Sequence, residues 1–403
     1  MSDVGREAGD TMGGDVIGRF WTPTEIVFGP GVAGTLAEHV GRLGARRVWL
    51  VTDPGVRAAG IVDRVAGPLA ALAGVEVTIW DDVHANPRDV ECEAGAAAAR
   101  DAGADLVVAV GGGSPLDAGK AMAALATNGG TVAGWAAPRT MDQPPLPLIA
   151  VPTTAGTGSE VTRSAVITDT ARRVKVTIKD PGLAPRVALV DPTLTWSLPP
   201  HVTAATGMDV LTHAVEAYTC RLANPISDGL ALHAIRLVAH SLATAVRDGD
   251  DHDARASMML ASTMAGMAFA NADVAGVHCL AEALGGRYDT PHGVANAMFL
   301  PHFVDFHRTA APGRHAEVAA ALGIDTRGRD VGHAAAAGAT LIAGLAREVG
   351  IPLFADLPGI DPADFPALAA AAEANGSNPS NARLMTAVDY QAILEQSWAE
   401  GVG

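Results

Sequence analysis

Cysteine is scarce in this chain, which has only three cysteines in 403 residues. Cys92, Cys220 and Cys279 form no CxxC pair, and their odd number argues against a disulfide framework. Cys279 follows His278 directly, but neighbouring residues of a helix point about 100° apart, which argues against a shared metal ion. This cysteine usage is typical of a reducing compartment, and we therefore expect a cytoplasmic protein.

Basic residues and long apolar runs are also few. The chain has 28 Lys and Arg against 44 Asp and Glu, a net charge of −16, and no basic run that would neutralise a nucleic acid backbone. The most apolar helical stretch, ALHAIRLVAHSLATAV, is interrupted by His233, Arg236 and His240, so no transmembrane helix is predicted. Residues 1–15 lack the pattern of a secretory signal and are predicted to be a disordered tail. We expect neither a nucleic acid nor a membrane as partner.

Apolar residues are plentiful, because 49% of the chain is hydrophobic and 18% is charged. Such a composition predicts a globular protein, and a chain of 403 residues is long enough for at least two domains at roughly 150 residues each. Between about residues 24 and 195, apolar strand-like runs alternate with Ala-rich stretches of helical length. The runs are TEIVF, RRVWLVTD, VEVTIW, ADLVVAVGGG and PLIAVPTT. This alternation predicts a mostly parallel sheet covered by helices.

The pattern of strand-like and helical segments changes after Leu198. Pro199 and Pro200 interrupt the chain, and helical patterns dominate from there to the end, with a break at GRYDTPHG and a loop at DLPGIDPADFP. We therefore predict an α/β domain over residues 16–198 and an all-α domain over residues 199–403.

A glycine-rich turn joins one predicted strand to the next helix. Gly111, Gly112 and Gly113 leave bare backbone amides at the start of a helix, where the helix dipole also favours a pyrophosphate. The run is not the G-x-G-x-x-G fingerprint, so an ordinary strand-to-helix turn remains an alternative. Ser114 and Asp117 have a second interpretation too, as a helix cap and its capping box.

Two further strand ends favour a dinucleotide. Hydroxyl side chains cluster in PTTAGTGSE at Thr153, Thr154, Thr157 and Ser159, where ribose and phosphate oxygens are expected to bind. Asp53 ends the run RVWLVTD; its carboxylate would accept the ribose hydroxyls of NAD and repel the 2′-phosphate of NADP, unless it only caps the following helix. These patterns favour NAD(H) over NADP(H).

Four residues of the second half have the side chains and spacing of a metal site. Asp209 and His213 lie four apart in a helical pattern and therefore share one helix face. His278 lies on a later helix, and His292 follows a proline turn fourteen residues further on. One carboxylate and three imidazoles suit Fe²⁺ or Zn²⁺ with a position left for substrate. Glu216, one turn after His213, is either a partner of a ligand or a solvated carboxylate.

Taken together, the motifs resemble the iron-containing (group III) alcohol dehydrogenase family. GGGSPLDAGK, PTTAGTGSEVT, ATGMDVLTHAVEAY and DTPHGVANAMFLPH occur in the family's order and approximate spacing over nearly the whole chain. The resemblance implies a Rossmann-like dinucleotide domain and a helical metal-binding domain, an architecture shared with dehydroquinate synthase. It also implies oxidoreduction between a small primary alcohol or diol and its aldehyde, with the metal as a Lewis acid, Fe²⁺ favoured over Zn²⁺, hydride transfer to nicotinamide C4, and a homodimer or larger homo-oligomer.

The resemblance also assigns roles to single positions. It implies that the metal ligands are Asp209, His213, His278 and His292. It implies dinucleotide contacts at Asp53, Asn86, Gly112, Gly113, Ser114, Asp117, Thr153, Thr154, Thr157, Ser164, Lys175 and Leu194. Phe269 falls where the family has an aromatic residue of the substrate pocket.

One position departs from the family pattern. Many members have a second histidine one turn after the position of His278, and this chain has Glu282 there. A carboxylate could relay a proton or favour a different substrate head group. Alternatives are a glycerol-type zinc polyol dehydrogenase, a dehydroquinate-synthase-like lyase, or a non-catalytic nucleotide- or metal-sensing protein. The complete PTTAGTGSEVT and PHGVANA motifs argue against the first two, and the complete ligand set argues against the third.

Overall fold

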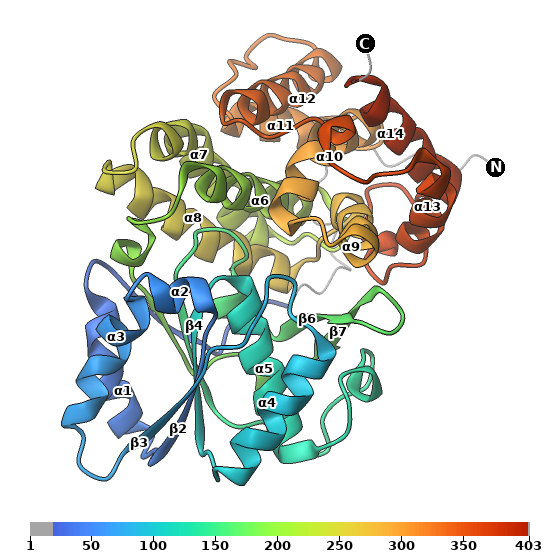
Figure 1. Ribbon diagram of the computed structural model, residues 1–403. Helices are drawn as coiled ribbons and strands as arrows, with labels where there is room; N and C mark the ends of the chain where they lie inside the picture. The colour runs from blue at the N-terminus through green and yellow to red at the C-terminus, as the bar shows by residue number, and fades with distance from the viewer. Residues whose placement is uncertain (1–18, 402–403) are drawn as a thin grey trace.

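The computed structural model describes residues 19–401, so the tail predicted at residues 1–15 lies outside the described residues. The described chain consists of a sheet part, formed by the first half, and a helical part that lies above it (Figure 1). The two parts contact each other where β7 of the β6–β7 hairpin packs against helix α9, and where the turn after β5 (Ser159–Val161) packs against helix α8.

The sheet part contains a six-stranded parallel sheet in the order β1-β8-β5-β4-β2-β3. A separate antiparallel hairpin consists of β6 and β7. The strands are β1 (Glu25–Phe28), β2 (Arg47–Val51), β3 (Glu76–Trp80), β4 (Leu106–Gly111), β5 (Leu148–Pro152), β6 (Ser164–Asp169), β7 (Val174–Lys179) and β8 (Val187–Val190). Every residue of β4 and β5 is buried, as expected for central strands of a parallel sheet that helices cover on both faces.

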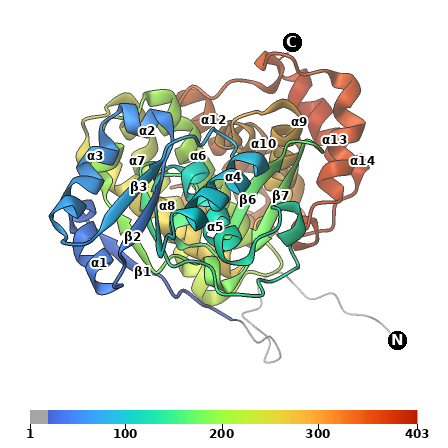
Figure 2. The same ribbon diagram turned by 60° about the horizontal axis from the view of Figure 1, so that its bottom comes forward.

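Helices cover the two faces of this sheet, as Figures 1 and 2 show from two directions. The helices of this part are α1 (Leu36–Arg42), α2 (Pro54–Ala58), α3 (Ile61–Ala66), α4 (Asp89–Asp101) and α5 (Gly113–Asn128). One face of the sheet packs against α1 and α3 through residues such as Leu36 and Val62, and the other packs against α4 and α5 through Ala96 and Met122. The resulting two-sided core places the ends of the strands next to the helical part.

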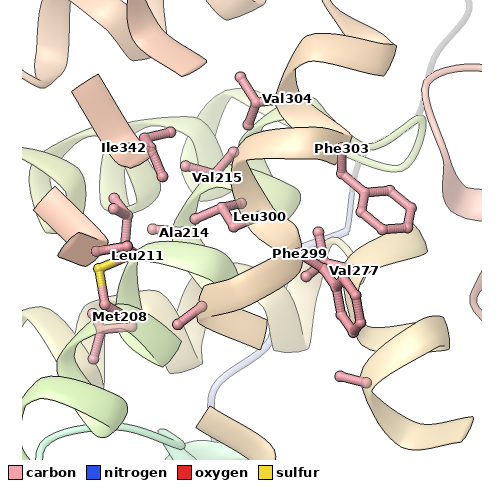
Figure 3. Packing of buried hydrophobic residues seen from close by; sticks show 14 of the residues in the cluster. Met208, Leu211, Ala214, Val215, Val277, Phe299, Leu300, Phe303, Val304 and Ile342 are labelled. Carbon is pink, nitrogen blue, oxygen red and sulfur yellow. The ribbon is translucent and has the colours of Figure 1, made fainter. Parts of the chain in front are cut away.

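The helical part begins at Pro200, and its described residues contain helices and loops but no strand. Its α-helices are α6 (Pro200–Thr219), α7 (Pro225–Arg247), α8 (His252–Asn271), α9 (Gly276–Tyr288), α10 (His292–His307), α11 (Pro312–Ala321), α12 (Val331–Glu348), α13 (Phe365–Glu373) and α14 (Ala387–Ala399). Figure 3 shows part of their common core, where Leu211 and Val215 of α6 lie near Leu300 of α10 and Ile342 of α12. Through this core, α10 packs against both α6 and α9.

The predicted fold class is confirmed, with two omissions. The sheet is parallel and covered by helices, the second half is helical, and the predicted break near GRYDTPHG separates α9 from α10. Strand β8 and the β6–β7 hairpin are missing from the predicted runs, because their alternating and short patterns are weaker than those of the buried central strands. The boundary between residues 198 and 199 stays a prediction.

Helix α7 is the one described helix that is long and apolar enough to cross a membrane by length and composition. Core helices of globular proteins meet the same criterion. Here Ile235, Val238 and Leu242 are fully buried, and α7 packs along both α6 and α8. Its apolar face is therefore used inside the helical core.

Candidate active site

A cleft of about 270 Å³ lies between the two parts of the molecule. The start of α5, the loop after β5 and the β6–β7 hairpin form one wall, with Ser114, Thr157 and Lys175 among its residues. Helices α6, α8, α9 and α10 form the other wall, where His213 and His278 line the cleft. The cleft therefore joins the predicted phosphate loop to the predicted metal ligands.

The four predicted metal ligands come together on three helices. Asp209 and His213 lie on α6, His278 lies on α9, and His292 is the first residue of α10. Their potential ligand atoms all lie within 4.8 Å of one another. Asp209 Oδ1 is 3.8 Å from His213 Nδ1 and 3.9 Å from His292 Nε2. Two ligand atoms bound to the same tetrahedral metal ion lie about 3.4 Å from each other. The spacing of the potential ligand atoms in this cluster is therefore close to that required by a divalent metal ion.

The state of the histidines also fits a metal site. Burial lowers the pKa of each of His213, His278 and His292 to about 4, so all three are neutral at physiological pH and have a lone pair to offer. His213 Nδ1 is buried and has no hydrogen-bond partner among the described residues. An unsatisfied buried nitrogen is costly unless a ligand occupies it, and a metal ion would satisfy it. Three imidazole nitrogens and one carboxylate suit Fe²⁺ or Zn²⁺.

Glu216 holds one of these ligands in place. Its Oε2 lies 2.5 Å from His278 Nδ1, which fixes the proton on Nδ1 and leaves Nε2 as the nitrogen for a metal. The same carboxylate accepts hydrogen bonds from the backbone N–H groups of Ala275 (2.9 Å) and Val277 (2.7 Å), at the start of α9. Glu216 is therefore a partner of a ligand rather than a solvated carboxylate.

Asn296 lies among the four candidate ligands, and the sequence did not reveal it. It lies one turn after His292 on α10, is fully buried, and donates a hydrogen bond from Nδ2 to Asp209 Oδ1 at 2.7 Å. The same nitrogen is 3.2 Å from His278 Nε2 and 3.1 Å from His292 Nε2. Its position in PHGVANA, four residues after a candidate ligand, is the signal that could have identified it.

The glycine-rich turn forms the start of α5, as predicted. Gly112 is the N-cap residue, α5 begins at Gly113, and a Cβ atom on Gly113 would lie 2.6 Å from Thr157 Cγ2. Only glycine allows the two loops to approach this closely. The alternative interpretation of Ser114 and Asp117 as a capping pair is wrong, because no side chain caps α5 and Asp117 instead accepts hydrogen bonds from Ser159 Oγ and Val166 N.

The predicted dinucleotide contacts divide into two groups. Those that line the cleft are Asn86, Gly113, Ser114, Asp117, Thr157, Ser164 and Lys175. Those that lie outside its lining are Asp53, Gly112, Thr153, Thr154 and Leu194. Leu194 is buried in the core against α1 and α3, so its side chain packs internally. The role of both groups as cofactor contacts stays a prediction.

Asp53 has the position expected for either of its interpretations. It follows β2 and caps α2, because its Oδ1 accepts the backbone N–H of Val56 at 2.8 Å. Its second carboxylate oxygen accepts no hydrogen bond from residues 19–401. The capping role and a role in ribose binding are therefore compatible in geometry.

Lys175 and Asn86 contact each other at the mouth of the cleft. Lys175 Nζ donates hydrogen bonds to Asn86 Oδ1 (2.7 Å) and Thr168 Oγ1 (2.9 Å). Asn86 Nδ2 in turn donates to Asp289 Oδ1 at the end of α9 (2.8 Å), which bridges the two parts of the molecule. Burial lowers the pKa of Lys175 to about 8.

The two predicted substrate-side residues both line the cleft. The ring of Phe269, on α8, stacks on His213 with 4.5 Å between ring centroids. Glu282 lies one turn after His278 on α9, and its Oε2 accepts a hydrogen bond from Asn375 Nδ2 at 2.7 Å. Burial raises the pKa of Glu282. Cys279 points into the helical core and does not belong to the ligand cluster.

Sequence comparison places the chain in a family. Residues 23–192 match the iron-containing alcohol dehydrogenase family, and residues 203–398 match the C-terminal region of the Fe-containing alcohol dehydrogenase family. The chain belongs to the iron-containing alcohol dehydrogenases. The resemblance inferred from the motifs is thereby confirmed, and so is the activity class, oxidoreduction between an alcohol and an aldehyde.

Individual members of the family are similar along almost the whole chain. A 1,3-propanediol dehydrogenase from Klebsiella pneumoniae is 42% identical over 381 residues, which cover 94% of this chain and 98% of the relative. The NAD-dependent methanol dehydrogenase of Bacillus methanolicus is 34% identical over 379 residues, which cover 94% of this chain and 99% of that relative. The crystal structure of a 1,3-propanediol oxidoreductase matches with a TM-score of 0.91 and 41% identity, and covers 95% of this chain and 100% of that chain.

Proposed function

We propose that this iron-containing alcohol dehydrogenase interconverts a small primary alcohol or diol and its aldehyde, with one divalent metal ion and NAD(H). The observation that carries the proposal is the Asp209, His213, His278 and His292 cluster, which opens into the same cleft as the start of α5. Bound at these positions, a metal ion would supply Lewis acidity toward the alcohol or carbonyl oxygen, and nicotinamide would accept or return the hydride.

The protein's own residues prepare the site for this chemistry. Glu216 orients His278 before an ion binds. The Nδ2 group of Asn296 contacts Asp209 Oδ1 and two imidazole nitrogens of the cluster and would have to release these atoms to the ion. Phe269 covers His213 and gives the cleft an apolar surface against which the carbon chain of a substrate can pack. Both Fe²⁺ and Zn²⁺ accept an N₃O ligand set, so the ligands do not distinguish the two ions. Family membership favours Fe²⁺.

The cofactor part of the proposal depends on the sheet side of the cleft. The free N–H groups at the start of α5 suit a pyrophosphate, and Thr157 and Ser164 offer nearby hydroxyl groups. Thr153, Thr154 and Leu194 lie outside the cleft lining and remain part of the proposed cofactor contacts through the family resemblance. The free oxygen of Asp53 supports NAD(H) over NADP(H), because it would repel a 2′-phosphate.

Two roles are proposed for Glu282: a proton relay and recognition of the substrate head group. Glu282 follows His278 by one turn on α9 and lines the same cleft as His292, where a proton relay would have to lie. Alternatively, its negative charge would favour substrates with a cationic group at the end opposite the reacting oxygen.

The decisive experiment measures NADH oxidation with C2 to C4 aldehydes after the apoprotein has been reloaded without oxygen with Fe²⁺ or Zn²⁺. Restored turnover with one ion would identify both the reaction and the metal. The variants Asp209→Ala and His278→Ala should lose turnover and still bind NADH, measured by its fluorescence. Full activity of either variant would contradict the metal role.

We further propose a cytoplasmic homodimer or larger homo-oligomer with a domain boundary at residues 198 and 199. All three cysteines are buried and unpaired, which is compatible with a reducing compartment. The boundary is supported by the change from β8 to α6 on either side of Pro199. Light scattering coupled to size-exclusion chromatography would measure the assembly state.

A further inference from the structure

The two walls of the cleft carry opposite charges. Lys175 and Lys179, on β7, line the sheet side, where the phosphates of a dinucleotide are expected. Asp273 and Glu282 line the helical side, next to Phe269. The sheet side can neutralise an anionic cofactor, whereas the helical side carries negative charge where the substrate would bind.

The carboxylate of Glu282 is only partly satisfied by the protein. Oε2 accepts one hydrogen bond, from Asn375, and Oε1 accepts none from residues 19–401. No Lys or Arg nitrogen of these residues lies within 4.0 Å of either oxygen. The charge of Lys175 lowers the pKa of Glu282, but the Lys175 ammonium group donates its hydrogen bonds to Asn86 and Thr168. Glu282 therefore has an open acceptor and no ion-pair partner.

Asp273 adds a second negative charge beside Glu282. Its two oxygens accept hydrogen bonds from Ser380 Oγ (2.6 Å), Ser377 Oγ (3.3 Å) and the N–H of Val274 (3.0 Å), which fix the loop between α8 and α9. Burial raises the pKa of Glu282, and the charge of Asp273 contributes to the same rise. A cation bound between the two carboxylates would remove this repulsion.

The distance from the ligand cluster to Glu282 limits the size of such a cation. Glu282 follows His278 by four residues on α9, which corresponds to about 6 Å along the helix axis. A substrate whose oxygen lies at the ligand cluster would therefore reach Glu282 with a chain of three or four carbons. Phe269 lines the same cleft and stacks on His213, so it gives the carbon chain an apolar surface beside the ligand cluster.

We propose that the preferred substrates are amino alcohols of three or four carbons with a terminal ammonium group, which Glu282 binds through its free oxygen. This inference rests on the function proposed above. In the oxidative direction the carbinol carbon gives a hydride to NAD⁺, the hydroxyl proton leaves to solvent, and the C–O bond becomes the C=O bond of an amino aldehyde. The ammonium group is unchanged.

The test compares four substrates of similar length with metal-loaded enzyme and NAD⁺ at pH 8, where an alkyl amine remains protonated. They are 3-aminopropan-1-ol, propane-1,3-diol, butan-1-ol and 3-hydroxypropanoate. We expect kcat/KM for the amino alcohol to exceed that of the diol and butan-1-ol by about tenfold or more, with the anionic substrate slowest. Glu282→Gln should lower kcat/KM for the amino alcohol at least about tenfold more than for butan-1-ol.

Two controls separate recognition from other roles of Glu282. Glu348→Gln removes an exposed carboxylate at the end of α12 and should leave the substrate preference unchanged. Propylammonium, which has no hydroxyl group, should bind the protein in calorimetric titrations, and Glu282→Gln should raise its Kd about tenfold. A proton relay predicts instead that Glu282→Gln lowers kcat for all four substrates alike and alters its pH profile.

The outcomes distinguish this inference from the proposed function. Oxidation of the diol and butan-1-ol without any preference for the amino alcohol would overturn the role of Glu282 and leave the dehydrogenase function intact. Absence of turnover with every substrate and either metal would contradict the function itself. Equal propylammonium binding by the wild type and Glu282→Gln would overturn the inference in either case.

Discussion

Glu216 contacts both a proposed metal ligand, His278, and the start of the helix that carries it. Its bond to His278 fixes the imidazole tautomer, and its bonds to the N–H groups of Ala275 and Val277 satisfy two donors that have no partner within α9. Such a carboxylate improves the ligand without touching the metal. At the residue scale, the site therefore depends on a side chain that the chemistry itself does not require.

Replacing Glu216 with Gln should weaken metal binding by about 10- to 100-fold, because the amide cannot accept from the imidazole and both backbone donors with the same strength. Competition with a fluorescent chelator would measure the affinity, and circular dichroism would check that the helices remain. Unchanged affinity would show that the packing of α9 alone orients His278.

The choice between NAD(H) and NADP(H) is a second property of a single residue. Asp53→Asn keeps an N-cap acceptor for Val56, since Asn caps helices as well as Asp does, but removes the negative charge. NADPH binding should therefore tighten by about tenfold with little change in stability. Fluorescence titration with NADH and NADPH measures both affinities. If both cofactors responded equally, charge repulsion at Asp53 would not be the basis of selectivity.

At the scale of elements, one buried lysine joins three segments next to the cofactor wall. Lys120 of α5 donates to Ser159 O (2.6 Å), Ser159 Oγ (2.7 Å), Thr162 Oγ1 (2.8 Å) and Ser164 O (2.9 Å). Burial lowers its pKa to about 8, and the charge of Asp117 opposes the decrease. The ammonium group thus ties α5 to the turn after β5 and to the start of β6.

Lys120→Met should lower the free energy of unfolding by about 2–4 kcal/mol, because buried acceptors would lose their donor. Urea denaturation followed by circular dichroism would measure the change. Lys179→Met, at an exposed position of β7, provides the control and should change stability by less than about 0.5 kcal/mol. If both variants had similar urea midpoints of unfolding, the oxygen atoms that accept from Lys120 would have found other donors.

At the scale of the whole molecule, an ion bound at the proposed metal cluster would cross-link distant parts of the chain. Its ligands come from α6, α9 and α10, and Asn86 of the sheet part bridges to Asp289 at the end of α9. An ion that binds only the folded state must therefore stabilise the helical part as a unit.

Saturation with Fe²⁺ or Zn²⁺ at about 1,000 times the Kd should add about 4 kcal/mol of stability and raise Tm by about 5–10 °C relative to chelator-treated protein. Differential scanning calorimetry without oxygen would detect this shift, and Asp209→Asn should abolish most of it. The same shift in Asp209→Asn would place the stabilising ion elsewhere.

The sequence by itself determined the fold class, the family and which four residues form the candidate metal cluster. Buried parallel strands need continuous apolar runs, and ligands four residues apart on a helix necessarily share a face, so both features are readable from local pattern. The break before His292 was also evident, because Pro291 cannot continue α9.

Only the tertiary structure decided which residues support the ligands and what faces the substrate. Asn296 meets Asp209 across 87 residues of sequence, and Asn375 meets Glu282 across 93. The capping role of Asp117 looked equally good in sequence, but packing of α5 against the turn after β5 gave that carboxylate other donors. Such contacts depend on how helices pack, and side-chain pairs that are distant in sequence leave no local period to detect.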